Sequence, residues 1–206
     1  PRSALADFAF LAIMAGVYLA GLVSYPYAEF PGVDVAVLGH LMWIRVGAFA
    51  LLEIRCVDGV GFGFWPEWPQ WKAGFRFYVL LLPAAVVLNL WLEFAHPRIQ
   101  PGWWWKAPAT FFGILWIVAL SEEFFFRGLL QQWLSRYWGP RLGLAAASLA
   151  FGAVHLPFRG FPNWRFALLA AVAGIFYGLA FQHSRSIRTP MVTHALVVTT
   201  WRSFFT

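Results

Sequence analysis

The chain has 206 residues, of which 61% are hydrophobic and only 12% are charged. Soluble domains are usually about 45 to 50% apolar and about 25% charged, so the composition excludes an ordinary soluble protein. The formal net charge is +6, but the basic residues are scattered through the loops and form no basic stripe of the kind that binds nucleic acid. We therefore expect an all-α fold, with residues 1–206 forming a single polytopic transmembrane domain and no nucleic-acid partner.

Apolar stretches bounded by proline, charge and tryptophan predict about seven membrane-spanning helices along the chain. The first three are expected as accessory spans in residues 1–107, and the last four are expected to form the core of the domain at about residues 108–206. In chain order, the expected spans are residues 4–23, 33–54, 75–94, 108–134, 142–156, 164–182 and 187–205.

Tryptophans mark two segments that we expect at the membrane interface. Trp65, Trp68 and Trp71 recur in the loop before the third span, and Trp103 to Trp105 precede the fourth. Indole rings prefer the headgroup zone, so membrane lipids are the expected partners of these segments, and specific ligand binding is the less favoured interpretation.

The distribution of Lys and Arg favours an N-terminus in the cytoplasm. Arg greatly outnumbers Lys, and the chain is rich in Ala, Gly and Trp, which is typical of a GC-rich bacterial source. We therefore expect the inner membrane of a bacterium. The single cysteine, Cys56, cannot form a disulfide within the chain.

The fourth expected span carries a charged cluster, Ser121-Glu122-Glu123-Phe124-Phe125-Phe126-Arg127. A charge at the bilayer centre costs about 2.5 to 3.5 kcal/mol on insertion scales, so such residues usually face a polar cavity. Glu123 and Arg127 are four residues apart, which predicts an ion pair along one helix face. Glu122 is turned about 100° from Glu123 and is therefore free to address a cavity, where it could act as a general base.

Two histidines in later spans are candidate partners, because imidazoles in a membrane are expected to face the bundle interior. Glu122 and His155 each lie about 20 Å along their helices from the loop that joins them, so their depths agree. His194 is only about 10 Å from Ile187, unless Pro190 belongs to a helix that begins deeper. Glu122, His155 and His194 also supply ligands that zinc accepts, but a mechanism without metal or other cofactor is favoured.

These residues resemble the three motifs of the CPBP group of intramembrane proteases, which includes the Ras-converting CAAX endopeptidases. The motifs are Glu122-Glu123-x-x-x-Arg127, then Phe151-x-x-x-His155, then His194, within about residues 108–199. The resemblance implies that Glu122 activates a water that attacks a peptide bond, while His155 and His194 hold the water or stabilise the oxyanion. Glu123 and Arg127 would shape the site, and the substrate would be a membrane-associated protein or peptide, with C-terminal processing as one form of the reaction.

The sequence departs from the family at Val198, where the family commonly has Asn or Asp. Valine cannot donate a hydrogen bond to a developing oxyanion; Thr199, Thr200 or Asn163 are candidate substitutes. A catalytically weak or inactive relative that binds a peptide is therefore one alternative. A proton- or ion-coupled transporter is another, although the sequence lacks the internal symmetry expected of one.

Overall fold

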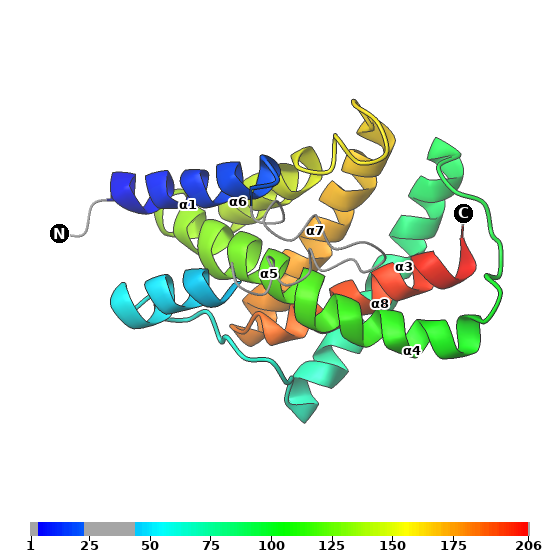
Figure 1. The fold of residues 1–206 in the computed structure, drawn as a ribbon, viewed down its shortest axis with the longest axis horizontal. Coiled ribbons are helices and arrows are strands. Elements are labelled where there is room, and N and C mark those ends of the chain that lie inside the picture. Colours follow the sequence, from blue (N-terminus) through cyan, green and yellow to red (C-terminus); the bar gives the residue numbers. More distant parts are fainter. Residues whose placement is uncertain (1–3, 23–43, 206) are drawn as a thin grey trace. The chain divides into compact units, whose positions relative to one another are not determined.

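The computed structural model describes residues 4–22 and 44–205, and these residues are helical and joined by loops (Figure 1). The described part contains no strand, only an isolated bridge between Pro97 and Phe205. The chain divides into two compact units, residues 1–58 and residues 59–206. The all-helical fold class expected from the sequence is confirmed.

The first unit contains α1 (Ala4–Leu19), which coincides with the first expected span. Its second helical part runs from residue 44 into the π-helical segment η2 (Phe49–Ile54). Residues 33–43 of the second expected span lie outside the described residues. Within this unit Arg55 pairs with Asp7.

The second unit begins with a loop and then α3 (Trp68–Leu92). This helix starts earlier than residue 75 because Glu67 and Gln70 form a capping box, in which each side chain bonds the other residue's backbone. Trp68 and Trp71 therefore belong to the first turns of α3 and not to a loop as expected, whereas their position at the membrane interface stays a prediction.

A helical run of 51 residues, Trp103–Ala153, follows α3. A straight helix of this length would measure about 77 Å, far more than the roughly 30 Å of bilayer hydrocarbon. The run breaks at Gly139, whose φ of 81° and ψ of 164° are not helical, and Pro140 follows. The two expected spans are thus joined by a kink. The consecutive segments are α4 (Trp103–Gly113), η3 (Ile114–Ala119), α5 (Leu120–Glu123), η4 (Phe124–Gln131) and α6 (Gln132–Ala153).

The last two helices, α7 (Trp164–Ser184) and α8 (Arg188–Phe204), match the expected spans closely. The side chain of Asn163 caps α7 by accepting a hydrogen bond from the backbone N–H of Phe166. α7 packs against α6, and α8 packs against α3, α4, η3 and α7 (Figure 1). This packing places α8 in the interior of the second unit.

Three helices of the described residues are long and apolar enough to cross a membrane: Trp68–Leu92, Trp103–Ala153 and Trp164–Ser184. The chain is thus an integral membrane protein, as its composition predicts. The count of about seven spans is not confirmed by these helices and stays a prediction. α8 has only 17 residues and buries Thr189, Thr193 and His194, which makes it a helix that carries polar groups into the core.

Candidate active site

A buried ion pair lies on the helical run at α5 and η4. Glu123 and Arg127 are 0% and 1% exposed. Arg127 Nε lies 3.2 Å from Glu123 Oε2, and Arg127 Nη1 donates to Glu123 Oε1 at 3.4 Å. The guanidinium also donates from Nη2 to the carbonyl oxygen of Gly174 on α7, at 3.1 Å. The ion pair predicted from the four-residue spacing is confirmed.

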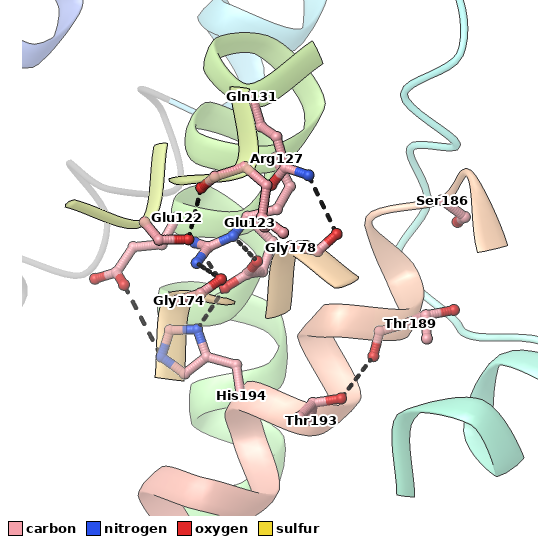
Figure 2. Close-up of polar contacts among 12 residues, drawn as sticks. Glu122, Glu123, Arg127, Gln131, Gly174, Gly178, Ser186, Thr189, Thr193 and His194 are labelled. Carbon is pink, nitrogen blue, oxygen red and sulfur yellow. Dashed lines mark hydrogen bonds and ion pairs between the residues drawn. The ribbon is translucent and has the colours of Figure 1, made fainter. Parts of the chain in front are cut away.

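His194 reaches from α8 to both carboxylates of α5 (Figure 2). Its Nδ1 lies 2.8 Å from Glu123 Oε1, and its Nε2 lies 3.9 Å from Glu122 Oε2. A carboxylate can only accept hydrogen bonds, so we assign the imidazole proton to Nδ1. In the neutral ring Nε2 then carries the lone pair, and this lone pair is available on the side of Glu122.

The two adjacent glutamates have different surroundings. Glu123 is held between Arg127 and His194, whereas the Glu122 side chain is 22% exposed. Glu122 Oε2 itself is buried and has no hydrogen-bond partner. A buried polar atom without a partner calls for an explanation, and a bound water or substrate group next to Glu122 would supply one.

Aromatic rings surround the charged groups. The ring of Tyr177 stacks on the imidazole of His194, with centroids 4.8 Å apart and an interplanar angle of 14°. The ring of Phe151 is nearly perpendicular to the same imidazole, with centroids 6.0 Å apart and an interplanar angle of 89°. The guanidinium carbon of Arg127 lies 4.4 Å from the Phe151 ring centroid and 5.3 Å from that of Tyr177. Cation–π contacts of this kind help to stabilise a desolvated guanidinium.

His155 lies apart from this cluster. α6 ends at Ala153, so His155 falls in the turn that follows, where Nδ1 is 2.7 Å from the carbonyl oxygen of Phe151. Its ring packs against those of Phe151 and Phe166. Within the described residues, no hydrogen bond or ion pair joins His155 to Glu122 or His194, and Phe151 is the residue that contacts both histidines. The catalytic role of His155 stays a prediction.

His194 meets α5 because the start of α8 is tied into the bundle. The backbone N–H of Ile187 donates to the Val60 carbonyl at 3.0 Å, and the Ser186 hydroxyl donates to the Gly61 carbonyl at 2.8 Å. Gly61 has a φ of +58°, and a Cβ there would fall 2.5 Å from Ser186 Cα, so only glycine permits this approach. The shallow position inferred for His194 from helix length therefore does not keep it from Glu123.

Three residues are candidates to supply the hydrogen-bond donor that Val198 lacks, and their own contacts differ. Thr200 Oγ1 is 2.7 Å from the hydroxyl of Tyr78. Asn163 caps α7 and donates from Nδ2 to the carbonyl of Phe158. Thr199 Oγ1 is buried and has no hydrogen-bond partner. None of these three side chains has a described contact with Glu122 or His194.

Two contributors were not assigned to the site from the sequence. Gln131, buried at 1% exposure, donates from Nε2 to the Gly178 carbonyl at 3.1 Å, one turn beyond the matching bond from Arg127 to Gly174. The signal for this pairing is the four-residue spacing in both helices, including Gly174-x-x-x-Gly178, a spacing typical of close helix packing in membranes. The second contributor is Tyr177, whose ring stacks on the imidazole of His194.

Among the described residues, no group of three or more His, Cys, Asp or Glu side chains is placed to hold a metal ion. A zinc set of Glu122, His155 and His194 would need His155 to join the other two.

Comparison with known families matches residues 103–200 to the family described as Rce1-like, type II CAAX prenyl endopeptidase. No curated protein and no solved structure matches the chain. The matched segment begins at the first residue of α4 and ends within α8, so it contains all three motifs. The resemblance drawn from the motifs is confirmed.

Proposed function

Because residues 103–200 match the family described as Rce1-like, type II CAAX prenyl endopeptidase, we propose that this chain is an intramembrane endopeptidase that uses Glu122 to activate a water. Its substrate is a membrane-associated protein or peptide, and C-terminal processing is one form of the reaction. The observation that carries the proposal is the position of His194 between two glutamates, 2.8 Å from Glu123 and 3.9 Å from Glu122.

The separation between Glu122 and His194 suits a shared water. If a water oxygen lay about 2.8 Å from both Glu122 Oε2 and His194 Nε2, the angle at the water between these two atoms would be roughly 90°. This angle is acceptable for a water that donates one hydrogen bond to each atom. The water would lie beside the line that joins Glu122 Oε2 and His194 Nε2, whose separation is 3.9 Å. Such a water would also satisfy the carboxylate oxygen that has no protein partner.

In the proposed reaction, Glu122 accepts a proton from the water while the water oxygen attacks the carbonyl carbon of the peptide bond. The same carboxyl then returns the proton to the departing amine nitrogen, as expected for a general acid and base. His194 Nε2 accepts a hydrogen bond from the water and holds it in place. Glu123 stays paired with Arg127 and accepts the hydrogen bond from Nδ1 of the imidazole. His155 is proposed to stabilise the oxyanion from the turn after α6 as a doubly protonated ring, in which Nδ1 donates to the Phe151 carbonyl and Nε2 donates to the oxyanion.

We further propose that the enzyme lies in a bacterial inner membrane with its N-terminus in the cytoplasm. The reaction as written requires no cofactor. If zinc were bound instead, Glu122, His155 and His194 would hold it, and the metal would polarise the water.

The test is the substitution Glu122→Gln, which keeps the size of the side chain and removes the base. Proteoliposomes containing the purified protein and membrane proteins of the expression host are incubated, and new peptide termini are read by mass spectrometry. We expect the rate of cleavage to fall by about 10²- to 10⁴-fold. The control is Glu93→Gln, at an exposed position in the loop after α3. Full cleavage by the Glu122→Gln protein would refute the proposal.

A second candidate function is peptide binding without cleavage, which Val198 favours because it leaves the turn after His194 without a hydrogen-bond donor. This alternative predicts that the wild-type protein and the Glu122→Gln variant capture the same intact peptides after photochemical crosslinking. New termini that depend on Glu122 would exclude it.

A further inference from the structure

Tyr177 is buried beside the site, and the catalytic scheme above does not use it. It lies on α7 with 2% of its surface exposed. The carbonyls of Gly174 and Gly178 on the same helix accept hydrogen bonds from Arg127 and Gln131. The helix that carries Tyr177 is therefore fixed to the helix that carries Glu122 and Glu123.

The hydrogen bond to Glu123 does not restrict every rotation of the His194 ring, because the ring plane can still tilt. The bond from Nδ1 determines which edge of the imidazole faces Glu123, because the opposite flip would place a carbon there. It does not set the plane of the ring, since the ring can tilt about the axis through Nδ1. Nε2 could then move away from Glu122 without breaking the bond to Glu123.

The stacking of Tyr177 restricts this tilt. Its ring lies nearly parallel to the imidazole, at 14° and 4.8 Å between centroids, and the Phe151 ring stands nearly perpendicular to the imidazole, with centroids 6.0 Å apart. Hydrogen bond and stack together direct Nε2 toward Glu122. The Tyr177 hydroxyl has no described hydrogen-bond partner, so the contact that acts on His194 is the ring face.

We propose that Tyr177 is a positioning residue, whose aromatic ring holds the imidazole of His194 in the plane that presents Nε2 to Glu122. The consequence for catalysis rests on the proposed function, whereas the effect on the imidazole does not. The proposal distinguishes the ring from the hydroxyl, since only the ring is required.

The kinetic test compares two substitutions at the same position. Tyr177→Phe keeps the stacking ring and should leave kcat and KM near their wild-type values. Tyr177→Leu removes the ring and should lower kcat by about 10- to 100-fold, as expected for a catalytic group displaced by about 1 Å, with KM little changed. The matched control is Phe181→Leu, which removes another ring that is 2% exposed, one turn further along α7.

The imidazole can be observed without any substrate. The five histidines of the detergent-solubilised protein are labelled with ¹⁵N, and the His194 signals are identified by their loss in His194→Gln. For the wild type, Tyr177→Phe and Phe181→Leu we expect a protonated Nδ1 and an unprotonated Nε2. In Tyr177→Leu we expect the Nδ1 shift to stay near its wild-type value, because the bond to Glu123 is kept, while the Nε2 signal shifts and broadens as the ring samples other tilts.

Three results would overturn the proposal. Tyr177→Phe could lose as much activity as Tyr177→Leu, which would assign the effect to the hydroxyl. Tyr177→Leu could leave both kcat and the His194 signals at wild-type values. Phe181→Leu could change the signals as strongly, which would indicate general loosening of α7. If the nitrogen shifts respond as expected but the wild type cleaves nothing, the positioning role stands and the proposed function fails.

Discussion

At the scale of single residues, spacing along one helix was enough to pair Glu123 with Arg127. Residues four apart share a face in any helix, and the pair is found there with an Nε to Oε2 distance of 3.2 Å. The contact between His194 and Glu123 joins residues 71 positions apart, and no local spacing determines it. Distances along the helices predict that His155 and Glu122 lie at the same depth in the membrane. Depth along a helix does not determine the direction in which a side chain points. In the described structure the Phe151 ring contacts both histidines, and no hydrogen bond joins His155 to Glu122.

Replacing Arg127 should destabilise the protein strongly. Arg127→Met removes one partner of an ion pair whose members are both at most 1% exposed, and the charge of Glu123 is left uncompensated. Breaking a buried pair in this way typically costs about 3 to 5 kcal/mol. The measurement is thermal unfolding in detergent, and the double variant Glu123→Gln with Arg127→Met should recover part of the loss.

The matched control for Arg127 is Arg188, whose partner Glu67 has a side chain that is 66% exposed. Exposed ion pairs contribute about 0 to 1 kcal/mol, so Arg188→Met should shift the unfolding temperature only slightly. Equal shifts for the two arginines would contradict the burial argument.

At the scale of elements, the packing of α3 against α8 determines where His194 lies. A Cβ on Gly74 would fall 2.6 Å from Val192 Cβ and 2.9 Å from the Thr189 carbonyl oxygen. Thr193, the residue before His194, donates to the Gly74 carbonyl at 2.9 Å. The two backbones therefore approach closely, and a side chain at residue 74 would push α8 away.

We expect Gly74→Ala to reduce cleavage activity and lower the unfolding temperature, because the displaced α8 carries His194 with it. Gly113→Ala is the control, since a Cβ at Gly113 meets nothing within 4 Å and Ala favours a helix by about 1 kcal/mol over Gly. Both effects are measured on the proteins in detergent, activity by release of new termini and stability by thermal unfolding. A Gly74→Ala protein as active and stable as Gly113→Ala would show that the approach of α3 and α8 is not needed.

The ends of the helices show where sequence patterns were informative and where they were not. α7 and α8 begin and end close to their expected bounds because charge, proline and a capping Asn163 mark the ends. The sequence predicts a loop between the expected spans 108–134 and 142–156. In the structure the helical run continues through this region and is interrupted only by the non-helical Gly139. The capping box at Glu67 and Gln70 extends α3 beyond the apolar stretch, and hydropathy alone does not detect such a cap.

At the scale of the whole molecule, composition was sufficient for an all-helical membrane protein, because helices satisfy their own backbone hydrogen bonds in hydrocarbon. The number of spans and the orientation depend on weaker signals. The Lys and Arg distribution favours a cytoplasmic N-terminus, and it places Cys56 in the cytoplasm and Ile99 on the opposite side.

Labelling of Cys56 tests the orientation. This residue is exposed and is the sole cysteine in the sequence. A membrane-impermeant maleimide should label it in inverted inner-membrane vesicles but not in intact spheroplasts. In a Cys56→Ser background, Ile99→Cys places the thiol at a position that is 68% exposed, and it should show the reverse pattern. Labelling of Cys56 in intact spheroplasts would invert the proposed topology.

The unequal surroundings of the neighbouring glutamates have a chemical consequence. Both oxygens of Glu123 are engaged by Arg127 and His194, whereas Glu122 has no side-chain hydrogen bond in the described structure and retains 22% exposure. A lipid-soluble carbodiimide, which forms an adduct with accessible carboxyl groups in membranes, should modify Glu122 and spare Glu123. An electrophilic inhibitor directed at this site would therefore meet a single accessible carboxyl group, even though two are adjacent in the sequence.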